Sequence, residues 1–156
     1  MLRLSKLTDY AVVVLVRLDS TGGMTTSPSL AQETGIPEPT VAKVLKALAA
    51  AGLVASQRGA RGGYRLARRL EEIPVARVIA AIDGPISLTA CVDGAVGGCE
   101  AQGLCPMRGR WDPVNQAIRS ALTRITLAEM RPEPPPASPF HVNSIPARDH
   151  APTAAE

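Results

Sequence analysis

The sequence predicts a mainly α-helical protein with one small β-hairpin. Its 156 residues include only four aromatic side chains, Tyr10, Tyr64, Trp111 and Phe140. The core must therefore be built from Leu, Val, Ile and Ala, which favours helices over a large sheet. Apolar residues also recur at helical spacing in several segments, whereas strand-like runs occur only as one short pair. The length suits one domain of roughly 100–150 residues with an added segment.

Two helices are predicted near the N-terminus. Ser5 can cap a helix over about 6–18. Its apolar face comprises Leu7, Ala11, Val14 and Leu18. Ser27 followed by Pro28 is typical of an N-cap and a first helical residue, and Gly35 can end that second helix in a left-handed cap.

A third helix begins at Pro39 and ends before Gly52. Its apolar face comprises Val41, Val44, Leu45 and Leu48. A short helix, a glycine turn and a longer helix over 27–51 form the helix-turn-helix pattern. Such a second helix enters the major groove with residues near its N-terminus at the base edges. The candidate DNA contacts are therefore Pro39, Thr40 and Lys43, with phosphate contacts at Ser27 and Ser29.

The short strands 54–57 and 64–66 flank a turn rich in Gly and Arg and predict a hairpin. Residues 54–70 contain five arginines and no acid, a composition suited to phosphate. A basic hairpin directly after a helix-turn-helix is a wing. We expect Arg58 and Arg61 to contact double-stranded DNA, with Tyr64 on the same surface.

The cysteines Cys91, Cys99 and Cys105 all lie in 85–110, which follows a helix predicted over 74–84 and shows no helical or alternating pattern. An odd count in a chain without a secretory signal favours metal or redox chemistry over disulfides. Zinc sites usually show closer Cys pairs, and wider spacing in a glycine-containing loop suits an iron–sulfur cluster. Zinc and unliganded thiols remain alternatives.

A long helix is predicted over 112–123, followed by a short turn in which Thr126 and Glu129 have capping-box spacing. The remaining structure is too small to cover its apolar stripe, so we expect a homodimer. The candidate interface residues are Val114, Ile118, Leu122 and Ile125. Residues 131–156 contain seven prolines and predict a disordered tail.

The predicted organisation is thus a winged helix-turn-helix domain (1–84), a cysteine-bearing loop (85–110), a C-terminal dimerisation helix (111–130) and the tail (131–156). No run of about 18 apolar residues and no secretory signal occurs, so we expect a cytoplasmic protein without a membrane contact. No nucleophile–base pair and no phosphate loop is present, which argues against an enzyme.

Four segments together resemble the IscR/NsrR family of winged-helix regulators. They are MLRLSKLTDYAVVVL, PTVAKVLKALAAAGLV, RGARGGYRLAR and LTACVDGAVGGCEAQGLCPMRGRW. The last is most similar to the branch that regulates the SUF iron–sulfur assembly system. The resemblance covers 1–130 and implies a homodimeric repressor of iron–sulfur assembly genes, with a 2Fe–2S or 4Fe–4S cluster on the three cysteines. A nitric-oxide or redox sensor of the same family, or a zinc- or thiol-based regulator, is the alternative.

The fourth cluster ligand departs from the IscR pattern. Members similar to IscR place a His three residues after the third cysteine, where this chain has Arg108. Arginine stays protonated and has no lone pair to donate. NsrR-type relatives use a carboxylate from the first helix of the other subunit, and the matching residue is Asp9. Glu100 and Asp112 are weaker alternatives.

Overall fold

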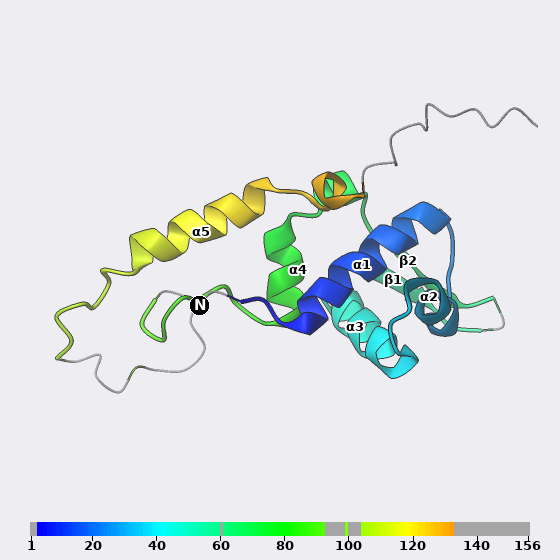
Figure 1. Cartoon of the computed structure of the whole chain (residues 1–156), viewed down its shortest axis with the longest axis horizontal. Coiled ribbons are helices and arrows are strands. Elements are labelled where there is room, and N and C mark those ends of the chain that lie inside the picture. The colour runs from blue at the N-terminus through cyan, green and yellow to red at the C-terminus, as the bar shows by residue number, and fades with distance from the viewer. Residues whose placement is uncertain (1–2, 60, 93–98, 100–103, 133–156) are drawn as a thin grey trace, which may run out of the picture.

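The computed structural model describes residues 3–59, 61–92, 99 and 104–132. It confirms a mainly helical chain with one two-stranded hairpin. In chain order the elements are α1 (Lys6–Thr21), α2 (Ser27–Thr34), α3 (Glu38–Ala50), β1 (Val54–Gln57), β2 (Gly63–Leu66), the 3₁₀ turn η1 (Leu70–Glu72), α4 (Val75–Ile82), α5 (Asp112–Arg124) and the 3₁₀ turn η2 (Leu127–Met130). Figure 1 shows α5 on the opposite side of α1 and α4 from α2 and the hairpin.

Side-chain caps set the starts of the first two helices. The Ser5 hydroxyl accepts from the Thr8 amide at 3.2 Å, which confirms the predicted cap of α1. The predicted cap of α2 is wrong by one residue, because the Thr26 hydroxyl, not that of Ser27, accepts from the Ser29 amide at 3.3 Å. Pro28 is compatible with a cap at either residue. Amides in the first helical turn have no partner within the helix, so the missing amide of proline removes no hydrogen bond there.

The core lies where α1, α3 and α4 meet. The apolar faces predicted for the first and third helices supply most of it. Its fully buried large side chains include Val14, Leu15, Leu18, Val41, Leu45, Leu48, Leu53 and Ile73. Gly52, in a left-handed conformation with φ 68°, ends α3 and returns Leu53 to this core.

The hairpin is joined to the start of α2. Val54 pairs with Leu66, and Gln57 pairs with Gly63 at the outer end. The Thr25 amide donates to the Tyr64 carbonyl at 2.9 Å, and the Tyr64 amide donates back at 2.8 Å. Because Thr25 directly precedes the cap of α2, these two bonds fix the hairpin relative to that helix.

The C-terminal turn completes the core. The Val75 amide, at the start of α4, donates to the Ile125 carbonyl at 2.9 Å, and the Leu127 amide donates to the Ile73 carbonyl at 2.9 Å. Leu127 is fully buried. The capping box is present as predicted, with the Thr126 amide donating to a Glu129 carboxylate oxygen at 2.8 Å.

Arg131 holds the end of the described chain to α1 and η1. Its guanidinium lies 2.7 Å from a carboxylate oxygen of Asp19 and 3.4 Å from one of Glu71. Of the predicted tail, residues 133–156 lie outside the described residues. No helix in the part of the chain that the structure describes is long and apolar enough to cross a membrane.

Candidate DNA-binding surface and cysteine segment

Helix α3 separates a buried face from a basic one. Its apolar residues pack into the core, while Pro39 and Lys43 are exposed and Thr40 is half-buried. Lys46 is also exposed, three residues after Lys43 and therefore on the same side of the helix. Lys46 was not among the predicted DNA contacts, although the spacing of the two lysines could have revealed it.

The start of α2 carries an unpaired hydroxyl. The Ser27 hydroxyl oxygen is buried and has no hydrogen-bond partner among the described residues. The Ser29 amide, by contrast, is already used by Thr26. A helix N-terminus favours anions, but the Ser27 hydroxyl is closed to solvent, so a phosphate here would meet the backbone amides of the first turn rather than that hydroxyl.

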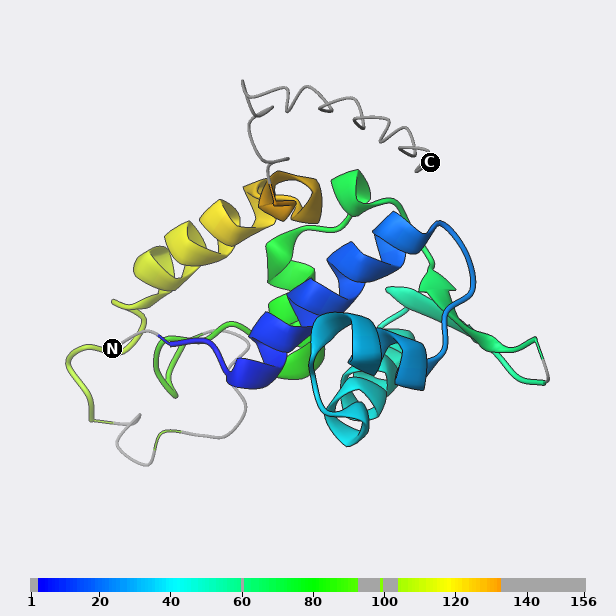
Figure 2. The same cartoon turned by 45° about the vertical axis from the view of Figure 1, so that its right-hand side comes forward.

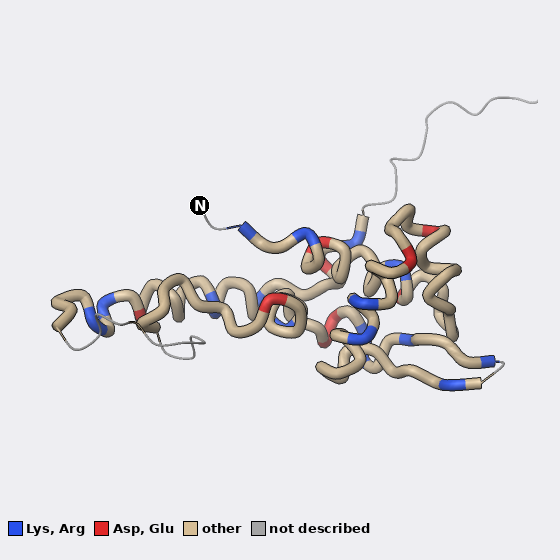
Figure 3. Tube along the Cα trace, turned by 90° about the horizontal axis from the view of Figure 1, so that it is seen from below, with Lys and Arg blue, Asp and Glu red and all other residues tan. Residues whose placement is uncertain are grey.

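The hairpin projects from the body as a basic arm, as Figure 2 shows. Arg58 and Arg61 flank its tip and are exposed, as is Arg65 on β2. Figure 3 shows blue residues on both strands of this arm and no red ones. Tyr64 is half-buried and packs against the core, so its described contacts hold the hairpin rather than leave the ring free.

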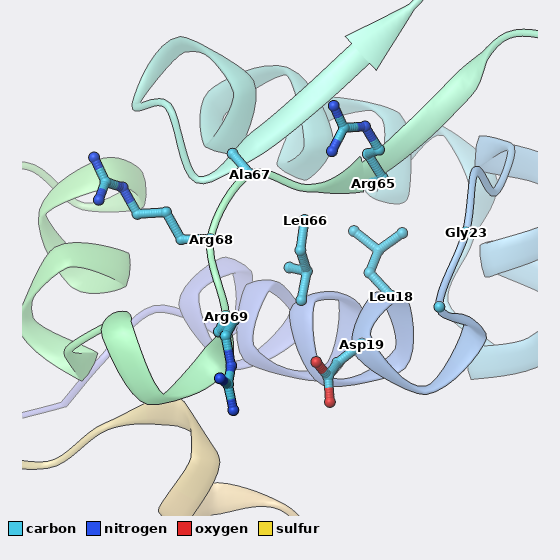
Figure 4. A pocket seen from close by; sticks show the side chains of 9 residues that line it. Leu18, Asp19, Gly23, Arg65, Leu66, Ala67, Arg68 and Arg69 are labelled. Atoms are coloured by element: carbon cyan, nitrogen blue, oxygen red, sulfur yellow. The ribbon is translucent and has the colours of Figure 1, made fainter.

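A cavity of about 330 Å³ lies behind the hairpin, between α1 and β2. Arg65, Arg68 and Arg69 line it together with Asp19. Figure 4 shows the three guanidinium groups pointing apart rather than toward one centre. The arginines that line the cavity therefore make this side of the molecule more positive. They do not come together around one point where an anion could bind.

The three cysteines are free and half-buried. The Cys91 sulfur lies 3.3 Å from the Thr89 hydroxyl. Soft thiolates of this kind suit an iron–sulfur cluster, so the donor set fits the predicted group. Among the described residues, however, no three His, Cys, Asp or Glu side chains gather closely enough to hold a metal ion.

The candidate fourth ligands are spread over the chain. Asp9 is exposed on the first turn of α1, and Asp112 is half-buried at the start of α5. Arg108 is exposed, and Glu100 lies outside the described residues. Nothing in the described chain joins Asp9 to the cysteines, so that ligand remains a prediction about the partner subunit.

Asp83 joins the end of α4 to the start of α1. Its carboxylate accepts from the Thr8 hydroxyl at 2.8 Å and from the Ser5 amide at 3.2 Å. Partial burial raises the pKa of Asp83, but the hydrogen bonds from Ser5 and Thr8 outweigh it and hold that pKa below its ordinary value. The turn that carries Asp9 is thereby tied to the residue that precedes the cysteine segment.

Asn115 is a second polar tie, which the sequence analysis missed. It is 3% exposed and is the one buried residue of α5. Its amide oxygen accepts from the Leu88 amide at 3.1 Å, and its amide nitrogen donates to the Ile86 carbonyl at 3.3 Å. The signal was an Asn inside an apolar helical stripe, which requires a local partner when buried.

The predicted dimer residues of α5 divide into two groups. Val114 and Ile125 are 44% and 41% exposed. Ile118 and Leu122 are half-buried, and Leu122 packs against the core of its own chain. Exposed apolar side chains thus remain near the two ends of α5, Val114 in its first turn and Ile125 directly after its last residue.

The chain matches known transcriptional regulators over most of its length. Residues 4–133 match the Rrf2 family, described as an iron-dependent transcriptional regulator. The HTH-type transcriptional regulator IscR of Photobacterium profundum is 34% identical over 131 residues, which cover 83% of this chain and 75% of the relative. The protein of the same name from Cronobacter sakazakii is 31% identical over 131 residues, covering 83% and 80%.

Solved structures give the same result. CymR, the global cysteine regulator of B. subtilis, superposes with a TM-score of 0.62 at 28% identity, covering 83% of this chain and 96% of that one. T. potens IscR superposes with a TM-score of 0.59 at 30% identity, covering 83% and 85%. The family match spans every helix and strand described above.

Proposed function

Because the chain belongs to the Rrf2 family of transcriptional regulators, we propose that an iron–sulfur cluster on Cys91, Cys99 and Cys105 controls how tightly it binds its operator. Family membership makes the chain a DNA-binding regulator rather than an enzyme. The observation that carries the proposal is the placement of three free, half-buried thiols between the winged helix and α5. The relatives named IscR and the iron-dependent description of the family support it.

The DNA contacts in this proposal come from three places. The exposed side of α3 with Pro39, Thr40 and Lys43 faces the base edges in the major groove. The backbone near Ser27 and Ser29, at the start of α2, takes a phosphate, and Arg58 and Arg61 extend over the adjacent DNA backbone. The regulator acts in the cytoplasm as a homodimer paired through α5.

Three thiolates and one oxygen donor hold the cluster in this proposal. Bound iron and sulfide supply electron-transfer chemistry and are sensitive to oxidants. The fourth donor is the partner subunit's Asp9, a harder and weaker ligand than thiolate, so this corner exchanges most readily. The target genes in this proposal are those of iron–sulfur assembly, and loss or change of the cluster alters how the protein binds their operators.

A second candidate is a regulator that responds through its thiols, or through zinc, without a cluster. The partial exposure of the three half-buried free cysteines favours this candidate, because it permits direct oxidation or nitrosylation.

Anaerobic purification followed by spectroscopy and operator titration separates the candidates. We expect iron and sulfide in the wild type, with visible absorption that disappears in Cys99→Ala and persists in the control Ser87→Ala. Loss of the cluster should change operator affinity about 5- to 150-fold, the usual allosteric range. Asp9→Ala should keep a cluster that decays faster.

Three outcomes would contradict the proposal in different places. Full cluster content in Cys99→Ala would remove the cysteine site. Zinc without iron, or metal-free protein whose operator affinity responds to thiol oxidation, would establish the second candidate. Wild-type cluster lifetime in Asp9→Ala would remove only the fourth ligand, and Glu100 would be tested next.

A further inference from the structure

Asn115 occupies an unusual place in α5. It is almost fully buried, while its neighbour Val114 is 44% exposed. Asparagine is a weak helix former, and burial of its amide is costly unless both ends find partners. Helix stability therefore gives no reason for an asparagine at this position.

The partners of Asn115 give the reason. Ile86 and Leu88 lie outside every helix and strand, so their backbone groups need partners from elsewhere. The side chain of Asn115 supplies one donor and one acceptor to these two residues. A side-chain amide does both through two separate atoms, whereas a carboxylate cannot donate and an alkyl chain can do neither.

The Asn115 contacts lie directly before Cys91. Thr89 accepts from the Val92 amide through its backbone carbonyl at 3.5 Å, and its hydroxyl contacts the Cys91 sulfur. Val92, which directly follows Cys91, is 4% exposed, so its buried side chain fixes the backbone on the C-terminal side of Cys91. Cys91 is therefore held between the Asn115 contacts and a buried valine.

We propose that Asn115 is a positioning residue that fixes Cys91 relative to α5. This inference rests on the proposed function, and it adds a link from the cluster to the helix expected to pair the subunits. A displacement of Cys91 would reach α5 through the two Asn115 hydrogen bonds. Their loss should leave the thiol present but poorly placed.

Two substitutions at this position test the link in graded steps. Asn115→Asp keeps the acceptor for Leu88 and loses the donor to Ile86, whereas Asn115→Leu loses both at similar volume. The control is Gln116→Leu, because Gln116 is exposed on the same helix and contacts only Ser120 among the described residues. A second control, Ile79→Ala, lowers stability in the core and leaves both Asn115 hydrogen bonds with their donors and acceptors in place.

The first readout needs no cluster. In protein carrying Cys99→Ser and Cys105→Ser, we expect Asn115→Leu to raise the alkylation rate of Cys91 by about tenfold and to abolish exchange protection of the Leu88 amide. Asn115→Asp should fall between Asn115→Leu and the wild type. Gln116→Leu and Ile79→Ala should leave the exchange protection of the Leu88 amide unchanged, once that protection is corrected for each variant's own free energy of unfolding.

The second readout is cluster loss to an iron chelator from reconstituted protein with all three cysteines. Asn115→Leu should lose its cluster about tenfold faster than Ile79→Ala at equal thermal stability. Equal rates in these two variants, or wild-type Leu88 protection in Asn115→Leu, would overturn the positioning role. If the wild type binds no cluster, the proposed function fails, and alkylation with amide exchange still decides the role of Asn115.

Discussion

Asp83 shows how one side chain can offset an unfavourable position. It follows the last residue of α4, where the helix dipole disfavours a carboxylate. Partial burial also raises the pKa of Asp83, but the hydrogen bonds from Ser5 and Thr8 outweigh it and hold that pKa below its ordinary value. The carboxylate thereby fixes the first turn of α1 against the end of α4.

The lowered pKa of Asp83 predicts a pH-dependent contribution to stability. A group whose pKa falls on folding stabilises the native state above its unfolded pKa, and the contribution is lost as pH falls through the folded pKa. Asp83→Asn should therefore reduce the free energy of unfolding by about 1 kcal/mol at pH 7, a value discounted for solvent screening, and by much less near pH 3. Thermal melts at both pH values measure this difference.

Thr8→Val provides the matching change on the donor side. Thr8 is 1% exposed, so removing its hydroxyl leaves the carboxylate without its shorter hydrogen bond. The double variant with Asp83→Asn should be less destabilised than the sum of the two single variants. Full additivity, or equal losses at both pH values, would contradict the assignment to this contact.

At the scale of elements, the hairpin and α3 have separable roles in DNA binding. Arg58→Ala and Arg61→Ala should weaken binding to all duplexes and flatten the salt dependence by about one unit for each lost phosphate contact. Lys43→Ala should instead change base preference. Fluorescence titrations over a salt series with specific and random duplexes would distinguish the two effects.

Arg124→Ala is the control for the loss of one positive charge, because Arg124 lies at the end of α5, away from the hairpin. It should leave both affinity and salt slope close to the wild type. If the hairpin variants and the α3 variant all lost the same affinity for specific and random duplexes, the two elements would not have separate roles in DNA binding.

The attachment of the hairpin depends on Gly63. A methyl group at Gly63 would lie 2.8 Å from the Thr25 carbonyl oxygen, closer than packing permits. Gly63→Ala should break the Thr25–Tyr64 bridge and lower operator affinity, while the core stays folded. Hydrogen exchange at the Tyr64 amide measures the bridge. The control is Gly59→Ala, because the added methyl group would meet open space and its effect reports only the strain of the left-handed backbone at that position.

Local patterns in the sequence predicted most elements, and long-range contacts account for what they missed. Helical spacing located α1, α3 and α4, and the capping box at Thr126 is an entirely local signal. The choice between Thr26 and Ser27 as a cap is a one-residue difference that composition cannot resolve. The contacts of Asn115 join residues 27 and 29 positions apart, and no local pattern reports them.

At the scale of the whole molecule, the exposed apolar side chains Val114 and Ile125, near the two ends of α5, predict a dimer. Val114→Asp is the most direct test, because Val114 is 44% exposed in its own chain, whereas Leu122 packs on the core. Burial of the new charge at a subunit contact should cost about 3 kcal/mol or more of association free energy. Sedimentation should show monomer for this variant and dimer for Gln116→Asp, and an unchanged dimer would exclude this face.

Truncation separates the described end of the chain from the residues beyond it. Removal of residues 133–156 should leave the melting temperature and operator affinity unchanged. Truncation after Met130 also removes the ion pairs of Arg131, which are solvent-exposed and should contribute less than about 1 kcal/mol. A large loss of stability in the first truncation would show that the tail packs on the folded protein.

The burial of Leu127 in the winged-helix core also governs the order in which the protein matures during translation. Chains emerge from the ribosome with the N-terminus first, and their domains fold as their residues become accessible. The hydrogen bonds of the Val75 amide and the Ile73 carbonyl form only after Ile125 and Leu127 have emerged. All three cysteines have therefore left the ribosome before the operator-binding domain can close, so we expect a nascent chain to be competent for metal loading before it is competent to occupy a promoter.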